Sequence, residues 1–198
     1  TQGFPPSLDA YPATDKFEVY AAGAALESIT LLKNEAVNGR MVLPFSSDDK
    51  LFVSGPTAHS LNALNGGWTG TWQVKDTTYN TAGRPTMVEA METRLGSEQI
   101  VHMDLGMEFS DQEIQRVVRS IQRQKPSHVV LGLGEMPYTE FMGNIEDIAL
   151  FENQKELVRA VHMTGVPLVG VFIEGRPRAF DDIEPMLDAI VMAYLPGD

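Results

Sequence analysis

The stretch His128-Val-Val-Leu-Gly-Leu-Gly-Glu-Met-Pro-Tyr-Thr-Glu-Phe-Met-Gly143 joins the pattern of a core strand to a long loop. Its first half, Val129 to Leu133, is short, apolar and partly β-branched, which predicts a strand buried on both faces. No amphipathic pattern returns until about Asn153, so we expect a long connection after the strand. Long loops are usually functional or disordered, and ligands of α/β sheets bind where the strands end. We therefore expect the functional site in this loop.

The loop carries two carboxylates, Glu135 and Glu140. A carboxyl group at a strand end can act as a general acid or base if burial raises its pKa toward neutrality. The alternative is that both are solvated loop charges, because the chain contains 27 acidic residues. The local pattern leaves both interpretations open.

Composition narrows the classes of function. A length of 198 residues predicts one domain of α/β size. The formal net charge of -12 argues against a nucleic-acid partner and against an anionic membrane surface, whereas a neutral sugar is compatible with it. The absence of cysteine excludes disulfides, zinc–thiolate sites and thiol catalysis. No apolar run approaches the length of a membrane span, and the N-terminus lacks a signal-peptide pattern.

The pattern of the N-terminal quarter of the chain predicts connecting segments around one helix. Residues 1–15 contain three prolines and predict a linker or an extended arm. A helix is predicted from Asp15 to Lys33, with apolar residues roughly on one face. These apolar residues are Phe17, Tyr20, Ala24, Ile29 and Leu32. A second connection runs from Asn34 to Asp49, with a turn at Asn38-Gly39.

From residue 50 onward, strand and helix patterns alternate. The predicted strands are 51–54, 99–102, 129–133, 167–173 and 189–194. The predicted helices are 86–95, 110–124 and 153–163, the first with a Thr86–Glu89 capping box. This alternation predicts a doubly wound α/β fold, a mostly parallel sheet with helices on both faces.

Two tryptophans, Trp68 and Trp72, lie in the glycine-rich segment from Asn65 to Trp72. Aromatic faces in such a loop are suited to stacking on a sugar. The alternative is that one or both fill the core beneath the loop, and their spacing does not distinguish these possibilities.

The remaining motifs predict structural roles. Gly132-Leu-Gly134 lacks the third glycine and the helix start of a phosphate loop. The four histidines have no metal-ligand spacing, and Ser54 lacks the flanking pattern of a nucleophile elbow. Arg176 follows the fourth predicted strand and is suited to clamp a loop or an adjoining domain, so we favour a structural role for it.

Six segments occur in one order along the chain. They are Ala25-Leu-Glu-Ser-Ile-Thr-Leu-Leu-Lys-Asn34 with Leu43-Pro44, Val53-Ser-Gly-Pro56, Gly66-Gly-Trp-Thr-Gly-Thr-Trp-Gln73, Gly134-Glu-Met-Pro-Tyr-Thr-Glu140, Gly175-Arg-Pro177 and Ala193-Tyr-Leu-Pro-Gly197. Together they resemble the second domain of family 3 glycoside hydrolases, the group of β-glucosidases and exo-glucanases. Each segment is modest alone, but their shared order over about residues 21–197 is specific.

The resemblance implies a six-stranded α/β sandwich that packs on a barrel-like first domain. Such enzymes retain configuration: an aspartate of the first domain attacks the sugar, and a carboxylic acid of the second protonates the leaving oxygen. It implies that Glu140 is this acid/base and that Glu135 anchors the loop, with Glu135 as the reserve candidate. It implies Trp72, rather than Trp68, as the residue stacking on the leaving sugar, and we count Trp68 and Tyr138 among the substrate-binding candidates. The implied substrate is a β-linked oligosaccharide or glucoside, and we expect no cofactor and no metal.

The chain departs from the family in lacking the first domain and its nucleophile. It also stops at Asp198, where the family continues into a sixth strand and further segments. We therefore expect a fragment, with a linker and helix in 1–49 and an incomplete α/β sandwich domain in 50–198, which is inactive without the N-terminal barrel domain. Relatives of this kind are often periplasmic or secreted.

Two other classes of function remain as alternatives. One is a non-catalytic carbohydrate-binding or interaction module of the same fold. The other is a flavodoxin-like signalling domain, which would need a phospho-accepting aspartate after the first strand. That strand ends in Val53-Ser-Gly-Pro56 and has none.

Overall fold

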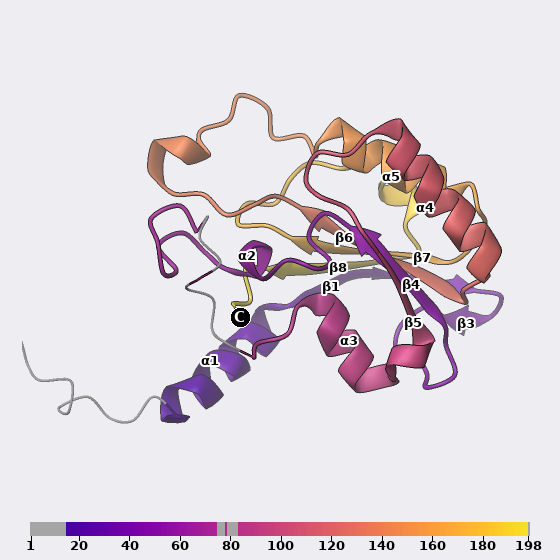
Figure 1. Cartoon of the computed structure of the whole chain (residues 1–198), viewed down its shortest axis with the longest axis horizontal. Helices are drawn as coiled ribbons and strands as arrows, with labels where there is room; N and C mark the ends of the chain where they lie inside the picture. The colour runs from indigo at the N-terminus through magenta and orange to yellow at the C-terminus, as the bar shows by residue number, and fades with distance from the viewer. Residues whose placement is uncertain (1–14, 75–77, 79–82, 198) are drawn as a thin grey trace, which may run out of the picture.

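The computed structural model describes residues 15–74, 78 and 83–197, and its core is a six-stranded sheet (Figure 1). The strands lie in the order β1-β8-β7-β6-β4-β5. Their bounds are β1 Thr30–Asn34, β4 Leu51–Gly55, β5 Ile100–Asp104, β6 His128–Gly134, β7 Leu168–Ile173 and β8 Ala189–Tyr194. Strands β4 to β8 pair in parallel and only β1 is antiparallel. The predicted doubly wound α/β fold is confirmed.

The predicted central strand is the longest of the sheet. Every residue of β6 is buried, as is every residue of β4 beside it. Since both faces of these strands are covered, their sequences are mostly apolar rather than alternating. The side chains still alternate between the two faces. Phe52 packs into one hydrophobic cluster, and its neighbours Leu51 and Val53 pack into the other.

Helices cover both faces of the sheet. On one face lie α4 (Asp111–Gln124) and α5 (Glu152–His162), and on the other lies α3 (Met87–Leu95) (Figure 1). The apolar stripe predicted for α4 is observed, with Ile114, Val117 and Ile121 in the core. The predicted capping box of α3 is also present: Thr86 Oγ1 accepts from Glu89 N at 3.3 Å, and Glu89 Oε2 accepts from Thr86 N at 2.8 Å.

The N-terminal helix differs from its prediction. It is α1 (Asp15–Ser28), not a helix to Lys33, and the next residues form β1. Strand β1 pairs with β8 in the register Thr30↔Met192. The apolar residues of this segment fit a helix and an edge strand equally well, and the open edge of β8 selects the strand because its backbone groups need partners. The sixth strand of the sheet is therefore β1, whereas we had placed the family's sixth strand after Asp198.

The predicted inward face of α1 is also wrong, because Phe17 is 55% exposed and Tyr20 75% exposed. The turn at Asn38-Gly39 is confirmed; both residues have positive φ and join β2 (Ala36–Val37) to β3 (Arg40–Met41). The predicted arm, residues 1–14, lies outside the described residues, and the division of the chain at residues 49 and 50 stays a prediction.

The shorter elements connect the layers. They are α2 (Leu61–Leu64), η3 (Ser97–Gln99), η4 (Glu140–Gly143) and η5 (Glu184–Met186). Within the described ranges, no helix combines the length and the apolar character needed to cross a membrane.

Candidate active site

The site lies where the connections of the sheet change direction. Strand β4 has β5 on one side and β6 on the other, so the chain moves outward from β4 in both directions. The carboxyl ends of β4 and β6 form a topological switch point, where open α/β sheets bind ligands. The backbones are close here: a Cβ on Gly55 would collide with the carbonyl oxygen of Gly132. The long loop predicted to carry the site, residues 135–151, leaves the sheet at this point (Figure 1).

The start of this loop is fixed by a buried amide. Gly134 has φ +129°, and a Cβ there would collide with the carbonyl oxygen of Ile173. The side chain of Gln154, fully buried on α5, donates from Nε2 to the Gly134 carbonyl at 2.7 Å. In return, Gly134 N donates to Gln154 Oε1 at 2.9 Å. This pair satisfies the backbone groups at the point where the sheet ends.

Glu135 is the first residue of the loop, and it is buried. Its side chain is 5% exposed and accepts hydrogen bonds from two arginines beyond β7. Arg176 Nε donates to Oε1 at 2.9 Å, and Arg178 Nε donates to Oε2 at 2.9 Å. A buried carboxylate needs such partners to offset its loss of hydration. Burial and, next, the Glu135 charge raise the pKa of the neighbouring Tyr138 phenol above its usual value.

Glu140 has a contrasting environment. It begins η4 with φ +50°, it is exposed, and its carboxylate makes no hydrogen bond or ion pair within the described part of the chain. Its neighbour Thr139 is buried and held by Gln73, whose Oε1 accepts from Thr139 N at 3.3 Å. The backbone around Glu140 is therefore restrained while its side chain is free to meet a ligand. The catalytic roles of Glu140 and Glu135 stay predictions.

The two tryptophans do not fill the core. Trp68 is 64% exposed and Trp72 48% exposed. Trp72 packs edge to face against Phe141, with ring centroids 6.3 Å apart. The structure thus brings Trp72 beside the residue that follows Glu140, whereas Trp68 has no such ring contact with a described residue. Their predicted role in substrate binding stays a prediction.

A cavity of about 630 Å³ lies at the base of the loop. Glu135, Tyr138 and both arginines line it, together with residues that the sequence did not single out. These include Gln73, Met107, Phe151 and Asn153. Neither Glu140 nor Trp72 lines this cavity, so these two predicted residues lie outside it.

The sequence reading missed Glu174. This residue directly follows β7, is fully buried, and has an Oε2 atom without a hydrogen-bond partner among the described residues. Its Oε1 accepts from Arg178 N at 2.9 Å. Burial, with a further contribution from the charge of Glu135, raises the pKa of Glu174 to about 7. The signal available was its place after an apolar strand and before Gly175-Arg-Pro177.

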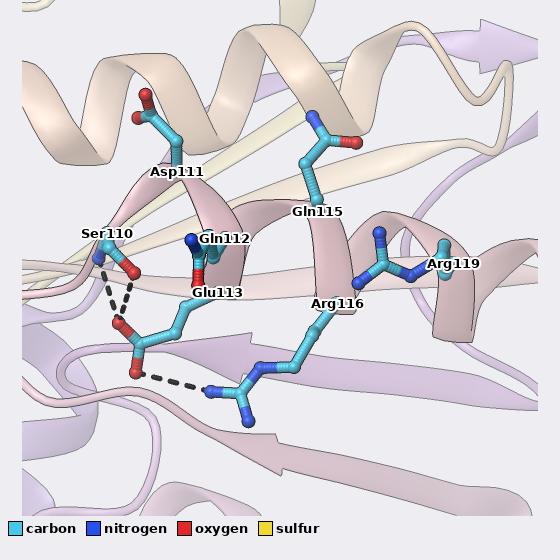
Figure 2. Close-up of a pocket in the computed structure, with 7 residues that line it drawn as sticks. All are labelled: Ser110, Asp111, Gln112, Glu113, Gln115, Arg116 and Arg119. Atoms are coloured by element: carbon cyan, nitrogen blue, oxygen red, sulfur yellow. Dashed lines mark hydrogen bonds and ion pairs between the residues drawn. The ribbon is translucent and has the colours of Figure 1, made fainter.

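A second hollow, of about 620 Å³, lies along α4 (Figure 2). Polar residues between Ser110 and Arg119 line it, and Figure 2 shows Glu113 between the Ser110 cap and Arg116. The Glu113–Arg116 ion pair spans 3.4 Å and belongs to the helix itself. This is a solvated helix face. No cluster of three or more histidine or acidic side chains suited to a metal occurs in residues 15–74, 78 and 83–197.

Three comparisons relate the chain to known proteins. The family model "Glycosyl hydrolase family 3 C-terminal domain" matches residues 29–198. The lysosomal beta glucosidase of Dictyostelium discoideum is 31% identical over 186 residues, which cover 89% of this chain and 22% of that protein. A beta-xylosidase of Formosa agariphila is 26% identical over 191 residues, which cover 93% of this chain and 25% of that protein. The beta-glucosidase of Listeria innocua, solved with isofagomine, superposes with a TM-score of 0.74 at 27% identity, covering 93% of this chain and 24% of that one. The chain thus spans a quarter or less of these relatives.

Proposed function

Because the chain belongs to glycosyl hydrolase family 3, as a C-terminal domain of that family, we propose that it is the second domain of a retaining, exo-acting β-glycosidase of the β-glucosidase type. In this proposal Glu140 is the general acid/base. The observation that carries it is the contrast within one loop: Glu135 is buried between two arginines, and Glu140 is exposed on a restrained backbone.

The exposure of Glu140 suits a site shared with another domain. The two carboxyl groups of a retaining glycosidase lie about 5–5.5 Å apart across the scissile bond. A nucleophile on a preceding domain can come that close to Glu140, which is exposed, but not to Glu135, which is enclosed by this domain. Glu140 would first protonate the leaving oxygen and then, as a carboxylate, take a proton from the attacking water.

The apolar surface of α1 supports a preceding domain. Val19, Tyr20 and Leu26 are each more than 70% exposed, at 72%, 75% and 73%. These exposed apolar side chains are suited to contact another domain. We propose that the barrel domain with the nucleophile covers them, and that residues 1–198 alone release no p-nitrophenol from an aryl β-glucoside.

The proposed substrate is a β-linked gluco-oligosaccharide. A D270A mutant of the Listeria innocua beta-glucosidase was solved with laminaribiose. In this chain, the exposed Trp72 beside Phe141 offers a rigid apolar face to the leaving sugar.

Glu140→Gln tests the acid/base role in an enzyme that contains this chain together with its preceding domain. We expect kcat/KM for laminaribiose to fall by about 10²–10⁴-fold. The dinitrophenolate leaving group of dinitrophenyl β-glucoside needs no protonation, so the variant's kcat/KM for this substrate should stay near that of the wild type. Added azide is a nucleophile that needs no general base, so it should raise the variant's kcat for this substrate.

Glu146→Gln, an exposed carboxylate on the same loop, is the control for the loss of one charge. Equal losses of kcat/KM for both substrates would rule out Glu140 as the acid. Sugar binding without any turnover in the wild-type enzyme would instead indicate a non-catalytic carbohydrate-binding module.

A further inference from the structure

Arg176 contacts three separate points of the segment that carries Glu140. Its Nε donates to Glu135 Oε1 at 2.9 Å, at the start of the segment. Its Nη1 donates to the carbonyl oxygen of Gly143, at the end. Between them, the guanidinium lies over the ring of Tyr138, 3.9 Å from the centroid. One side chain thus closes residues 135–143 into a loop whose two ends are tied together.

The neighbouring arginine, Arg178, binds a different part of the loop. Arg178 is 7% exposed, and its Nη1 donates to the carbonyl oxygens of Asp147 and Ala149, at 3.3 and 3.0 Å. It shares Glu135 with Arg176, but each arginine binds a different carboxylate oxygen. Arg178 therefore holds the returning part of the loop, and Arg176 holds the part that contains Glu140.

Packing within the segment makes the Arg176 contacts effective. A Cβ on Gly143 would collide with the ring of Tyr138, so these two residues are already in close contact. The Gln73 side chain also hydrogen-bonds both the backbone N and the hydroxyl of Thr139. Glu140 itself has no side-chain partner in the described ranges, so the direction of its carboxyl group depends on the backbone from Tyr138 to Gly143.

We propose that Arg176 is a positioning residue for Glu140: it fixes the backbone that aims the acid at the leaving oxygen. This inference rests on the proposed function and assigns a role within the same site. The role needs an arginine, because its planar fork donates in two directions while its face stacks on Tyr138. A lysine at position 176 would keep the charge and could reach Glu135, but a single ammonium cannot make all three contacts.

The test uses Arg176→Ala and Arg176→Lys in an enzyme that contains this chain with its preceding domain. A reacting group displaced by about 1 Å costs about 10²-fold in rate. We expect kcat/KM for laminaribiose to fall by about that factor in both variants, whereas kcat/KM for dinitrophenyl β-glucoside stays within about threefold. Hydrogen exchange of the amides of residues 138–144 should accelerate by about tenfold or more, because the loop opens more often.

Arg159→Ala is the matched control, since Arg159 also binds carboxylates, namely Glu152, Glu156 and Asp182, but on the surface near α5. Arg159→Ala should change neither the kcat/KM values nor the hydrogen exchange of residues 138–144. Equal losses of kcat/KM for both substrates, or unchanged exchange in the loop, would overturn the positioning role.

Wild-type behaviour of Arg176→Lys would also overturn it, by reducing the role to charge. If Arg176→Ala does not fold, Arg176→Lys alone decides between these outcomes. Failure of the proposed function is seen separately, in Glu140→Gln: if that variant shows no dependence on the leaving group, the positioning role falls together with the function.

Discussion

The buried Glu174 makes the stability of this protein depend on pH in a calculable way. Its carboxyl group is fully buried, and one oxygen has no donor among the described residues. Burial raises its pKa from 4.5 to about 7. The folded protein therefore holds this proton more tightly than the unfolded chain does. The resulting stabilisation is complete below pH 4.5 and is lost as the pH rises through about 7.

Glu174→Gln removes this dependence while keeping the Oε1 acceptor for Arg178 N. One pKa unit corresponds to about 1.4 kcal/mol, so the shift of Glu174 corresponds to roughly 3 kcal/mol in full. Between pH 5 and pH 8 the wild type should lose roughly 2–3 kcal/mol that the variant does not lose. Any fixed effect of the new amide on the free energy of unfolding is the same at both pH values and cancels.

The assay is urea unfolding of both proteins at pH 5 and pH 8, with Glu146→Gln as the control for removing one exposed carboxylate. The free energy of unfolding of Glu174→Gln, relative to the wild type, should rise by roughly 2–3 kcal/mol between the two pH values. A change below about 1 kcal/mol, or one of opposite sign, would refute the account of Glu174 as a carboxyl group kept neutral by burial.

Two further predictions concern the base of the loop and its aromatic surface. Gln154→Met leaves the buried N–H and C=O of Gly134 without the side-chain amide, so the free energy of unfolding measured in urea titrations should fall by about 2–5 kcal/mol. Gln115→Met, at an exposed position, is the control and should leave the free energy of unfolding nearly unchanged. In an enzyme that also contains the preceding domain, Trp72→Ala should raise KM for laminaribiose about tenfold, because Trp72 packs against Phe141 and offers its face to the sugar. Trp68→Ala should raise this KM less. Equal increases in KM for the two variants would show that Phe141 does not orient the stacking face.

Local patterns were sufficient for most of the elements. The apolar runs of β6 and β7 and the amphipathic pattern of α4 each reflect burial of a particular face, so the residues carry the signal themselves. The capping box of α3 involves only Thr86 and Glu89, three residues apart. The loop after β6 was predicted as the site for the same reason, because a buried strand followed by a long connection without an amphipathic pattern is visible in one window of sequence.

Interactions between distant segments were not visible in this way. The end of α1 and the start of β1 depend on the open edge of β8, which lies about 160 residues further along the chain in the register Thr30↔Met192. Likewise, Glu135 was predicted as an anchor only through a family resemblance. Its partners, Arg176 and Arg178, are 41 and 43 residues away and come within reach because β6 and β7 are neighbours in the sheet.

Glu174 illustrates the physical reason for this limit. Its sequence context, an acidic residue after an apolar strand, resembles that of Glu135, yet Glu135 has two guanidinium partners and Glu174 receives one backbone N–H. Whether a carboxyl group stays charged depends on the donors and the water around it, and these are contributed by other segments. The sequence therefore located the strand ends and singled out Glu135, whereas the packing of β6, β7 and the loop revealed Glu174 and assigned each carboxylate its environment.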